Sequence, residues 1–122
     1  MNSKDVLGLA GERLAEKFLR ASGLKIIARR FRTRAGEIDL IAMDGDEVVF
    51  VEVKTRRSAR FGTPEESVTR TKRAHLRAVA FAYLSSTHRP RARFRIDVVA
   101  IEVFVNESPR ITHIRSAVGD ED

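Results

Sequence analysis

The amino-acid sequence predicts an α/β protein in which a mixed β-sheet is flanked by α-helices, in the order α-β-β-β-α-β with a further β-strand at the end. Three observations lead to this fold class: apolar residues at helical spacing near the N-terminus, two β-rich runs around a tight turn, and a second helix followed by another β-rich run. With 122 residues, of which 43% are hydrophobic, the chain is long enough for one domain with its own core. We expect this domain over residues 1–115 and a flexible acidic tail over residues 116–122.

The first helix is predicted over residues 7–22, because apolar residues recur there at intervals of three and four. Gly23 follows this stretch and supplies a stop signal. Between Ile26 and Phe31 the apolar residues indicate a first strand, which ends at the turn-prone residues 34–36. The apolar residues of the helix are Leu7, Ala10, Leu14, Ala15, Phe18 and Leu19.

A β-hairpin comes next. The β-rich runs at residues 37–43 and 47–56 are separated by the turn-forming sequence Asp44-Gly45-Asp46. This combination of two strand patterns around a short glycine-containing turn is typical of two antiparallel neighbours.

A second helix begins, by its sequence signals, at Thr63. Thr63 is a capping residue, Pro64 suits the first helical turn, and Glu66 completes a capping box. The helix is predicted to run to about Ser85. Two further strands are predicted over residues 94–104 and, as a short edge strand, over residues 111–115.

The composition excludes several functional classes. There is no cysteine, and the three histidines lack the close spacing of metal ligands, so thiol chemistry and zinc sites are not expected. The longest apolar stretch, from Ala78 to Leu84, is too short to cross a bilayer. The N-terminus has an early acid and no uninterrupted apolar core, unlike a secretory signal, so we expect no membrane association and a cytoplasmic location.

Basic and acidic residues occur in separate blocks along the chain. Overall, 23 Lys and Arg residues outnumber 17 Asp and Glu residues, for a formal net charge of +6. Six acids and no base lie between Ala35 and Val53, whereas arginines cluster before and after this stretch. Arginine is by far the commoner base, and its planar guanidinium suits phosphate groups, so the pattern favours a nucleic-acid partner. The alternative is that these charges only solvate the surface.

The register of the hairpin decides whether its acidic residues meet. A two-residue turn would place Asp39 opposite Glu52 and Glu37 opposite Lys54, so that three acids and one lysine converge. A turn with one more residue would move these side chains to opposite faces. Ile38, Leu40, Ala42, Val49, Val51 and Val53 are predicted to share the other face of the hairpin.

Carboxylates inside such an apolar hairpin require compensation. Ile41, Val48 and Phe50 make even the acid-bearing face partly apolar, so ionised side chains there lose hydration. A divalent hard cation such as Mg²⁺ would compensate, since it binds one or two carboxylates and keeps water for the substrate phosphate. Lys54 would then be an electrostatic or orienting group. The alternative is a solvated hairpin in which Glu37 and Lys54 form an ordinary cross-strand pair.

Two segments of the hairpin carry a resemblance. Gly36-Glu37-Ile38-Asp39-Leu40-Ile41 and Val49-Phe50-Val51-Glu52-Val53-Lys54-Thr55-Arg56 resemble the YraN-like family within the PD-(D/E)XK nuclease superfamily. Further similar blocks are Gly11-Glu12, Phe61-Gly62-Thr63-Pro64 and Arg95-Ile96-Asp97-Val98-Val99.

The resemblance implies a restriction-endonuclease-like core with a metal-dependent active site. It implies that Asp39 and Glu52 are ligands of Mg²⁺ or Mn²⁺ and that Lys54 is the catalytic lysine. Glu12 corresponds to a glutamate that joins the site in similar archaeal Holliday-junction resolvases, although an exposed place on its helix is the alternative. Glu37 is a further candidate catalytic residue, because the predicted hairpin register places it with the other acids and Lys54.

Basic residues around the acids are candidate nucleic-acid contacts. Lys72 lies on the apolar stripe of the second helix, so its ammonium either reaches the acidic pocket or a phosphate, or extends to solvent. Asp97, next to Arg95 on a strand, is interpreted as a structural ion-pair partner. The candidate phosphate contacts are Arg32, Arg34, Arg56, Arg57, Arg60 and Lys72.

Three functions are compatible with these features. The first is a Mg²⁺- or Mn²⁺-dependent nuclease acting on structured or branched nucleic acid, with DNA favoured over RNA and a homodimer suited to a two-armed junction. The second is a non-catalytic nucleic-acid-binding module with a nuclease-like fold. The third is a basic surface that binds an anionic protein or the ribosome. The set Asp39, Glu52 and Lys54 favours the first, because acids near phosphate do not help a module that only binds.

Overall fold

The computed structural model describes residues 3–57, 68–88 and 92–119, and in this part of the chain two helices flank one five-stranded sheet with the strand order β1-β2-β3-β4-β5. The predicted α/β class and the order of its elements are therefore confirmed. The sheet is mixed, because β3 and β4 run parallel while the other neighbours run antiparallel. The elements are α1 (Ser3–Ala21), β1 (Lys25–Thr33), β2 (Gly36–Asp44), β3 (Glu47–Arg56), α2 (Arg70–Ser86), β4 (Phe94–Glu102) and β5 (Arg110–Val118).

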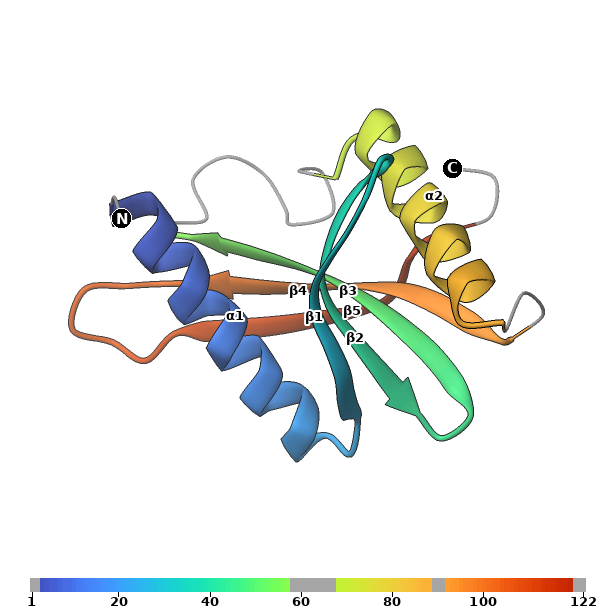
Figure 1. The fold of residues 1–122 in the computed structure, drawn as a ribbon. Coiled ribbons are helices and arrows are strands. Elements are labelled where there is room, and N and C mark those ends of the chain that lie inside the picture. The colour runs from blue at the N-terminus through green and yellow to red at the C-terminus, as the bar shows by residue number, and fades with distance from the viewer. Residues whose placement is uncertain (1–2, 58–67, 89–91, 120–122) are drawn as a thin grey trace.

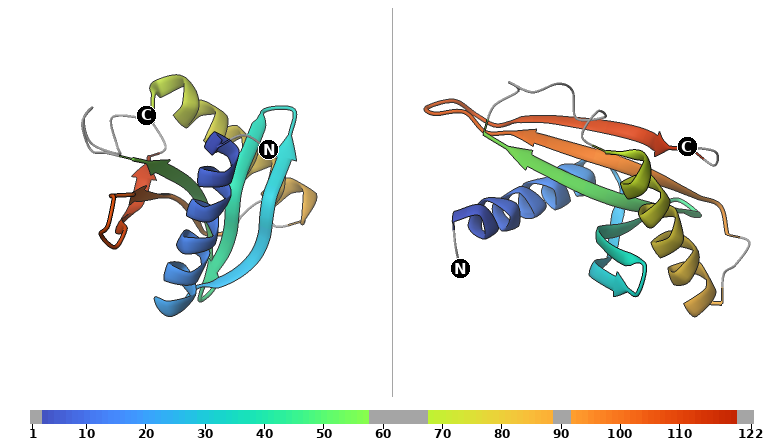
Figure 2. Two further views of the ribbon diagram at one scale, coloured as in Figure 1. Left: turned by 90° about the vertical axis from the view of Figure 1, so that its left-hand side faces the viewer. Right: turned by 90° about the horizontal axis from the view of Figure 1, so that it is seen from above.

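The β1–β2 hairpin turns away from the other strands and stands upright beside them in Figure 1. The end of the hairpin that holds its turn lies against α2, because a Cβ atom built on Gly36 would be 3.7 Å from Val79 and 3.9 Å from His75. Farther from that turn the hairpin lies along α1, as the left view of Figure 2 shows, and Arg29 of β1 reaches Glu16 of α1. The hairpin therefore contacts both helices.

One helix covers each face of the sheet. Successive residues of β3 point to opposite faces and therefore pack against different helices. Val48 and Phe50 pack in a cluster with Leu76 of α2, whereas Val49 packs in a second cluster with Leu19 of α1. The α2 cluster contains Ile38, Ile41, Val48, Phe50, Val68, Leu76, Val79, Ala80, Leu84, Ile96, Val98 and Val118. The α1 cluster contains Ala15, Leu19, Leu24, Leu40, Ala42, Val49, Val51, Val99 and Ile101.

Helix α1 comes very close to β3 at Gly11. A Cβ atom built on Gly11 would overlap Thr55 Oγ1 and lie only 2.9 Å from Thr55 Cβ. Beside Gly8, one turn earlier in the helix, the space is open. The missing side chain of Gly11 therefore permits the close approach and places the next residue, Glu12, near the sheet.

Helix α2 begins later than the sequence predicts. The predicted start at residues 63–66 lies outside the described residues, but Val68 and Thr69 are described and are not helical. The hydroxyl of Thr69 accepts a hydrogen bond from the backbone N–H of Lys72 at 3.2 Å, so this threonine is the N-cap and Arg70 the first helical residue. Val68 is buried in the α2 cluster, which fixes the chain in a non-helical conformation just before the cap.

The last two strands also differ from their predicted limits. Strand β4 ends at Glu102, two residues before the predicted end. Strand β5 continues to Val118, beyond the expected domain boundary at residue 115, because the side chain of Val118 is buried in the α2 cluster. Of the expected tail, residues 120–122 lie outside the described residues.

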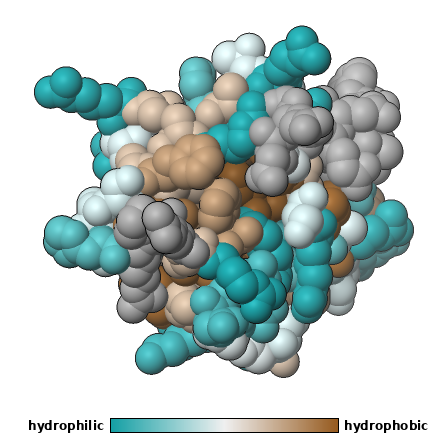
Figure 3. Space-filling view, turned by 90° about the vertical axis from the view of Figure 1, so that its right-hand side faces the viewer, coloured by the Kyte–Doolittle hydropathy of each residue, from teal (hydrophilic) through white to brown (hydrophobic). Residues whose placement is uncertain are grey.

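Apolar side chains also reach the surface. Figure 3 shows hydrophobic residues in the middle of the face that lies on the right of Figure 1, with hydrophilic residues around them. Phe81 of α2 is 55% exposed, and its ring packs edge to face on Phe94 of β4 with the centroids 5.7 Å apart. Neither helix, over its described residues, is long and apolar enough to cross a membrane.

Candidate functional site

The register of β2 and β3 is the one that a two-residue turn predicts. Gly45, the first turn residue, has a φ angle of 62°, which glycine adopts readily, and the paired positions extend to Leu40 and Val51. Asp39 and Glu52 are the next residues on the two strands. Their carboxyl groups share a hydrogen bond, so the two predicted metal ligands lie side by side.

The first strand changes faces at Arg30. Arg29 forms an ion pair with Glu16 of α1 at 2.7 Å, whereas the ring of Phe31 packs edge to face on Tyr83 of α2 at 5.2 Å. Residues two apart in a regular strand share a face, so the alternation is interrupted between them. The φ angle of Arg30 is 51°, in the left-handed region that a residue with a side chain rarely adopts, and this accounts for the interruption.

Strand β2 shows the same interruption at Asp39, opposite Arg30. Leu40 packs in the α1 cluster, but Ile38 packs in the α2 cluster. The prediction that Ile38 and Leu40 share a face is therefore wrong, because it assumes a regular pleat through Asp39. At this irregular position Asp39 Oδ2 accepts a hydrogen bond from the backbone N–H of Val53 at 2.7 Å.

Two lysines complete the arrangement. Lys72 Nζ lies 2.9 Å from Glu52 Oε2, and the side chains of these residues are 35% and 8% exposed, respectively. Lys54, two residues after Glu52 on β3, is in hydrogen-bond contact with Lys72. The N-cap of α2 holds the backbone N–H of Lys72, and the side chain of Lys72 reaches the sheet at Glu52. We refer to Asp39, Glu52, Lys54 and Lys72 as the acid–lysine cluster.

The two acids respond differently to this environment. Burial, together with the hydrogen bond and negative charge of Glu52, raises the pKa of Asp39 to about 8, although the N–H of Val53 works in the opposite direction. Burial also acts on Glu52, but its contacts with Asp39 and Lys72 outweigh burial and lower its pKa. At neutral pH without metal, Asp39 therefore holds a proton that it shares with ionised Glu52.

The two lysines are also shifted in opposite directions. Burial, followed by contact with the Lys72 ammonium, lowers the pKa of Lys54. Burial disfavours the charge of Lys72 as well, but its contacts with Lys54 and Glu52 outweigh burial and raise its pKa. Lys72 thus keeps its positive charge while Lys54 is the lysine that loses a proton more easily.

The remaining candidate acids lie in different places. Glu12 of α1 is close enough to Asp39 for its charge to contribute to the raised pKa of Asp39, and it forms an ion pair with Arg30 at 3.1 Å. Glu37 pairs with Arg32 of β1 at 3.5 Å instead of Lys54. The predicted convergence of Glu37 with Lys54 is therefore wrong, because the hairpin beyond Asp39 turns toward α2 and takes Glu37 with it.

The predicted phosphate contacts are spread over several surfaces. Lys72 belongs to the acid–lysine cluster, and Arg32 is exposed beside Glu37. Arg34 is exposed near the β1–β2 turn, and Arg57, just after β3, is exposed as well. Arg56, at the end of β3, is half-buried, and Arg60 lies outside the described residues.

Asp97 belongs to a separate ion-pair network, as the sequence predicts. Arg95 Nε lies 3.1 Å from both carboxylate oxygens of Asp97, and His113 Nε2 lies 2.7 Å from one of them. Arg95 also contacts Asp44 and Glu47 at 2.9 and 2.8 Å. Asp97 is completely buried, and both of its carboxylate oxygens are bonded within this network.

The acid–lysine cluster offers a two-carboxylate donor set. Over residues 3–57, 68–88 and 92–119, no three acids, histidines or cysteines are grouped closely enough to hold a metal ion by themselves. Asp39 and Glu52 alone match the preference of Mg²⁺ for one or two carboxylates with water in the other positions. A cation bound between the two carboxyl groups would replace the proton that they share and would offset the repulsion between the two ionised groups.

The polar face of α1 was not predicted from the sequence. Glu16 binds Arg29 and Arg20, and Glu12 binds Arg30, so this face is joined to β1 by a row of ion pairs. A signal was present, because charged residues at positions 12, 13, 16, 17 and 20 recur at helical spacing beside the apolar stripe. The partners on β1 could not be identified from that spacing alone.

Comparison with known proteins identifies the family. A model described as "Uncharacterised protein family UPF0102" matches residues 11–101. The chain is 51% identical to a UPF0102 protein of Syntrophomonas wolfei over 91% of its own length and 96% of the relative's. It is also 48% identical to a UPF0102 protein of Rhodococcus opacus over 91% and 94% of the two chains. The matched region includes Glu12 and the whole acid–lysine cluster, and the chain belongs to the UPF0102 family.

Proposed function

We propose that this protein is a metal-dependent nuclease of the PD-(D/E)XK type that hydrolyses phosphodiester bonds in structured or branched nucleic acid, with DNA favoured over RNA. The observation that carries the proposal is the contact between the carboxyl groups of half-buried Asp39 and buried Glu52, with two lysines beside them. Two carboxyl groups placed together in an apolar sheet are costly, because burial and the charge of Glu52 keep Asp39 from ionising, so a functional use for the pair is the better explanation. The resemblance of the hairpin sequence to this nuclease superfamily supports the same conclusion.

Asp39 and Glu52 would hold Mg²⁺ or Mn²⁺. When bound, such an ion lowers the pKa of coordinated water and neutralises negative charge on a phosphodiester. Glu12 contributes negative potential from the α1 side of Asp39. The N–H of Val53 fixes one oxygen of Asp39, so the carboxyl group is oriented before any ligand arrives.

The lysines have separate tasks in this proposal. Lys54, two residues after Glu52 on β3, orients the attacking water, and its lowered pKa makes it easier to deprotonate than an ordinary lysine. Lys72, which keeps its charge, moves from Glu52 to the scissile phosphate and stabilises the negative charge that develops there. The contact of the Lys54 amine with the Lys72 ammonium couples these tasks, because the charge of Lys72 lowers the pKa of Lys54.

The exposed arginines fit a polyanionic substrate. Arg32 and Arg34 near the hairpin tip and Arg57 after β3 are exposed and would bind phosphates of the substrate. If the substrate is a four-way junction, two strands must be cut, and a homodimer would supply two sites. We expect the enzyme to act in the cytoplasm.

A cleavage assay on a panel of substrates tests the proposal. Single-stranded, duplex, flap, splayed and four-way DNA, and matching RNA, are incubated with the full chain and a titration of MgCl₂ or MnCl₂. Asp39→Asn and Glu52→Gln are each expected to reduce metal-dependent cleavage by about 100-fold or more. Glu37→Gln is the matched control, because Glu37 is on the same strand as Asp39 but pairs with Arg32, and this variant should retain activity.

Two results would contradict the nuclease proposal. Equal cleavage by all three variants and the parent would assign the activity to a contaminant. Salt-sensitive DNA binding that chelators do not affect, with no cleavage of any substrate, would indicate the non-catalytic nucleic-acid-binding module.

A further inference from the structure

A pocket of about 440 Å³ lies between α1 and β1, next to the acid–lysine cluster. Leu9 and Leu40 contribute apolar wall to it, and the carbon stems of its long basic side chains add to that surface. This volume falls in the range of ligand-binding pockets, about 300–1,000 Å³, and is much larger than a phosphate ion needs. The lining residues are Leu9, Glu12, Arg13, Glu16, Lys17, Arg20, Arg29, Arg30 and Leu40.

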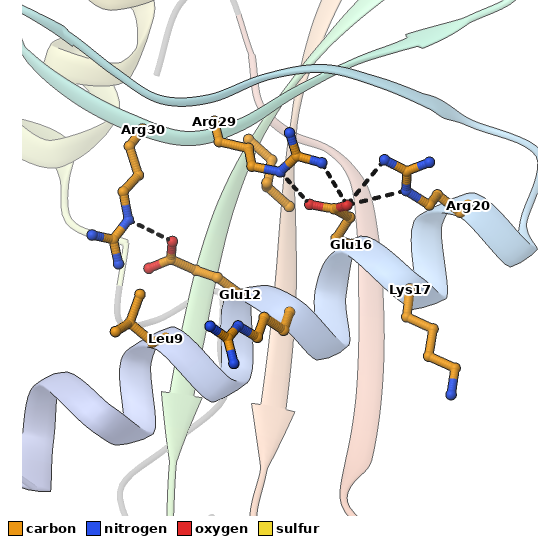
Figure 4. A pocket seen from close by; sticks show the side chains of 9 residues that line it. Leu9, Glu12, Glu16, Lys17, Arg20, Arg29 and Arg30 are labelled. Carbon is orange, nitrogen blue, oxygen red and sulfur yellow. Dashed lines mark hydrogen bonds and ion pairs between the residues drawn. The ribbon is translucent and has the colours of Figure 1, made fainter.

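The pocket carries an excess of positive charge. Five of its lining residues are basic and two are acidic. Figure 4 shows Arg29 and Arg30 extending from β1 toward α1, where Glu16 and Glu12 receive them. Each guanidinium has five N–H donors, so an arginine held by a carboxylate still has donors for a second anion.

Three of the lining arginines form ion pairs with the acids of α1, and Arg30 does so through Glu12. Glu16 binds Arg29 through both of its oxygens at 2.7 Å, and it also binds Arg20 at 3.0 Å. These contacts orient the guanidinium groups of Arg29 and Arg20 along the wall of the pocket before a ligand binds. A fixed guanidinium plane is a surface on which a nucleobase can stack.

The pocket is connected to the acid–lysine cluster through Glu12, Arg30 and Leu40. Glu12 lines the pocket and also acts electrostatically on Asp39. Leu40 directly follows Asp39 and faces the α1 side of the sheet. A ligand in the pocket would therefore lie within a short distance of a phosphate bound at Asp39.

We propose that this pocket binds one unpaired nucleotide of the nucleic-acid substrate, with the base inside and the phosphate at the arginine rim. The inference rests on the proposed nuclease function and specifies its substrate class: DNA with an unpaired nucleotide beside the cleavage site. The base of a paired nucleotide stays stacked inside the duplex, so only an unpaired base can enter a concave pocket of this size. The arginines then bind the phosphate of that nucleotide and direct the strand toward Asp39.

A binding assay that does not depend on cleavage tests the inference. Fluorescence anisotropy compares a blunt duplex, the same duplex with a three-nucleotide overhang, and the overhang with abasic sites, all in EDTA. The parent protein should bind the overhang about tenfold more tightly than the blunt duplex, and abasic sites should remove this preference. Because no cleavage is measured, loss of the preference and loss of nuclease activity are separate results.

Variants locate the preference in the pocket. Leu9→Trp fills the cavity without changing its charge, and it should remove the preference for the overhang while keeping affinity for the blunt duplex. Val6→Trp is the matched control, because Val6 is on the same helix, is 53% exposed and does not line the pocket. Circular dichroism checks that both variants fold.

Several outcomes would overturn the inference. Equal binding of blunt and overhanging duplexes by the parent would show that no unpaired base is recognised. A preference that survives in Leu9→Trp, or equal weakening of all three substrates by this variant, would show that the pocket supplies only general attraction for phosphate. A preference that persists with abasic sites would have the same meaning.

Discussion

Lys72 on the first turn of α2 and Glu52 on β3 form an ion pair of 2.9 Å across the acid–lysine cluster. The pair joins two elements that are separated in the sequence, and it neutralises the one acid of the cluster that remains ionised. A metal ion at Asp39 and Glu52 would take over this neutralising role. Lys72 and the metal ion are therefore expected to compete for the same carboxylate.

Replacing Lys72 should strengthen the effect of metal on stability. Lys72→Met is expected to lower the free energy of unfolding without metal by about 1–2 kcal/mol, a modest loss because the lysine is partly exposed. Added MgCl₂ should then stabilise this variant more than the parent. Urea unfolding with and without MgCl₂ measures both effects, and Arg70→Met, an exposed change on the same helical turn, is the control. An equal response of variant and parent to MgCl₂ would mean that Lys72 does not compete with the ion.

The raised pKa of Asp39 predicts how stability depends on pH without metal. The pKa is about 8 in the folded state and 3.8 for an ordinary aspartate, so this group favours the folded state at low pH. Its contribution is fully present below about pH 4 and is lost as the pH rises through 8. Asp39→Asn removes the loss, and the variant should be more stable than the parent at pH 9 by about 1–3 kcal/mol.

Chemical unfolding in EDTA between pH 4 and pH 9 measures this difference. The advantage of Asp39→Asn should shrink steadily toward pH 4. Glu37→Gln, which removes a carboxyl group outside the cluster, is the control. A pH-independent advantage of Asp39→Asn would contradict a raised pKa at this residue.

Helix α1 lies close to β3 at Gly11 but not at Gly8, so alanine should have opposite effects on stability at these two positions. Alanine in a helix is normally more stable than glycine by about 1 kcal/mol, so Gly8→Ala, where the space is open, should stabilise the protein by about 0.5–1 kcal/mol. Gly11→Ala should instead destabilise it by about 1–3 kcal/mol, because the new Cβ overlaps Thr55 Oγ1. Thermal unfolding of the two variants provides the comparison. Equal gains in both would show that α1 can move away from β3 without loss.

The buried network around Asp97 should affect stability without affecting catalysis. Asp97→Asn leaves the buried guanidinium of Arg95 with a weaker partner, and a loss of about 2–4 kcal/mol is expected. Asp46→Asn is the matched control, since the pair of Asp46 with Arg93 is exposed and should be worth less than about 1 kcal/mol. Urea unfolding gives the stabilities, and cleavage assayed well below the melting temperature should be unchanged. Loss of cleavage by folded Asp97→Asn would place this carboxyl group in the active site.

The strands and their order could be predicted because local patterns determine them. The limits of β3 coincide with its predicted run, and the two-residue turn at Gly45 determines the register that brings Asp39 to Glu52. Lys72 could be singled out because a lysine on an apolar helical stripe needs a partner. Its partner, Glu52, could not be predicted, because the contact depends on how α2 packs on the sheet.

The features that were missed depend on tertiary structure. A capping signal at Thr63 is strong in isolation, yet Thr69 is the cap of the described helix because Val68 is held in the core. The left-handed conformation of Arg30 has no signature in a single sequence, since arginine does not favour it. Without that conformation, alternation places Ile38 and Glu37 on the wrong sides.

The conformation of Arg30 separates stability from geometry at a single position. Glycine would adopt this backbone with less strain, by about 1 kcal/mol, but it would give up the ion pair with Glu12 and a positive charge that lines the pocket between α1 and β1. An engineered Arg30→Gly chain would therefore have less backbone strain at this position, beside unchanged Asp39 and Glu52. A substitution at position 30 would therefore change the backbone strain of the hairpin and its link to α1 without altering any residue of the acid–lysine cluster.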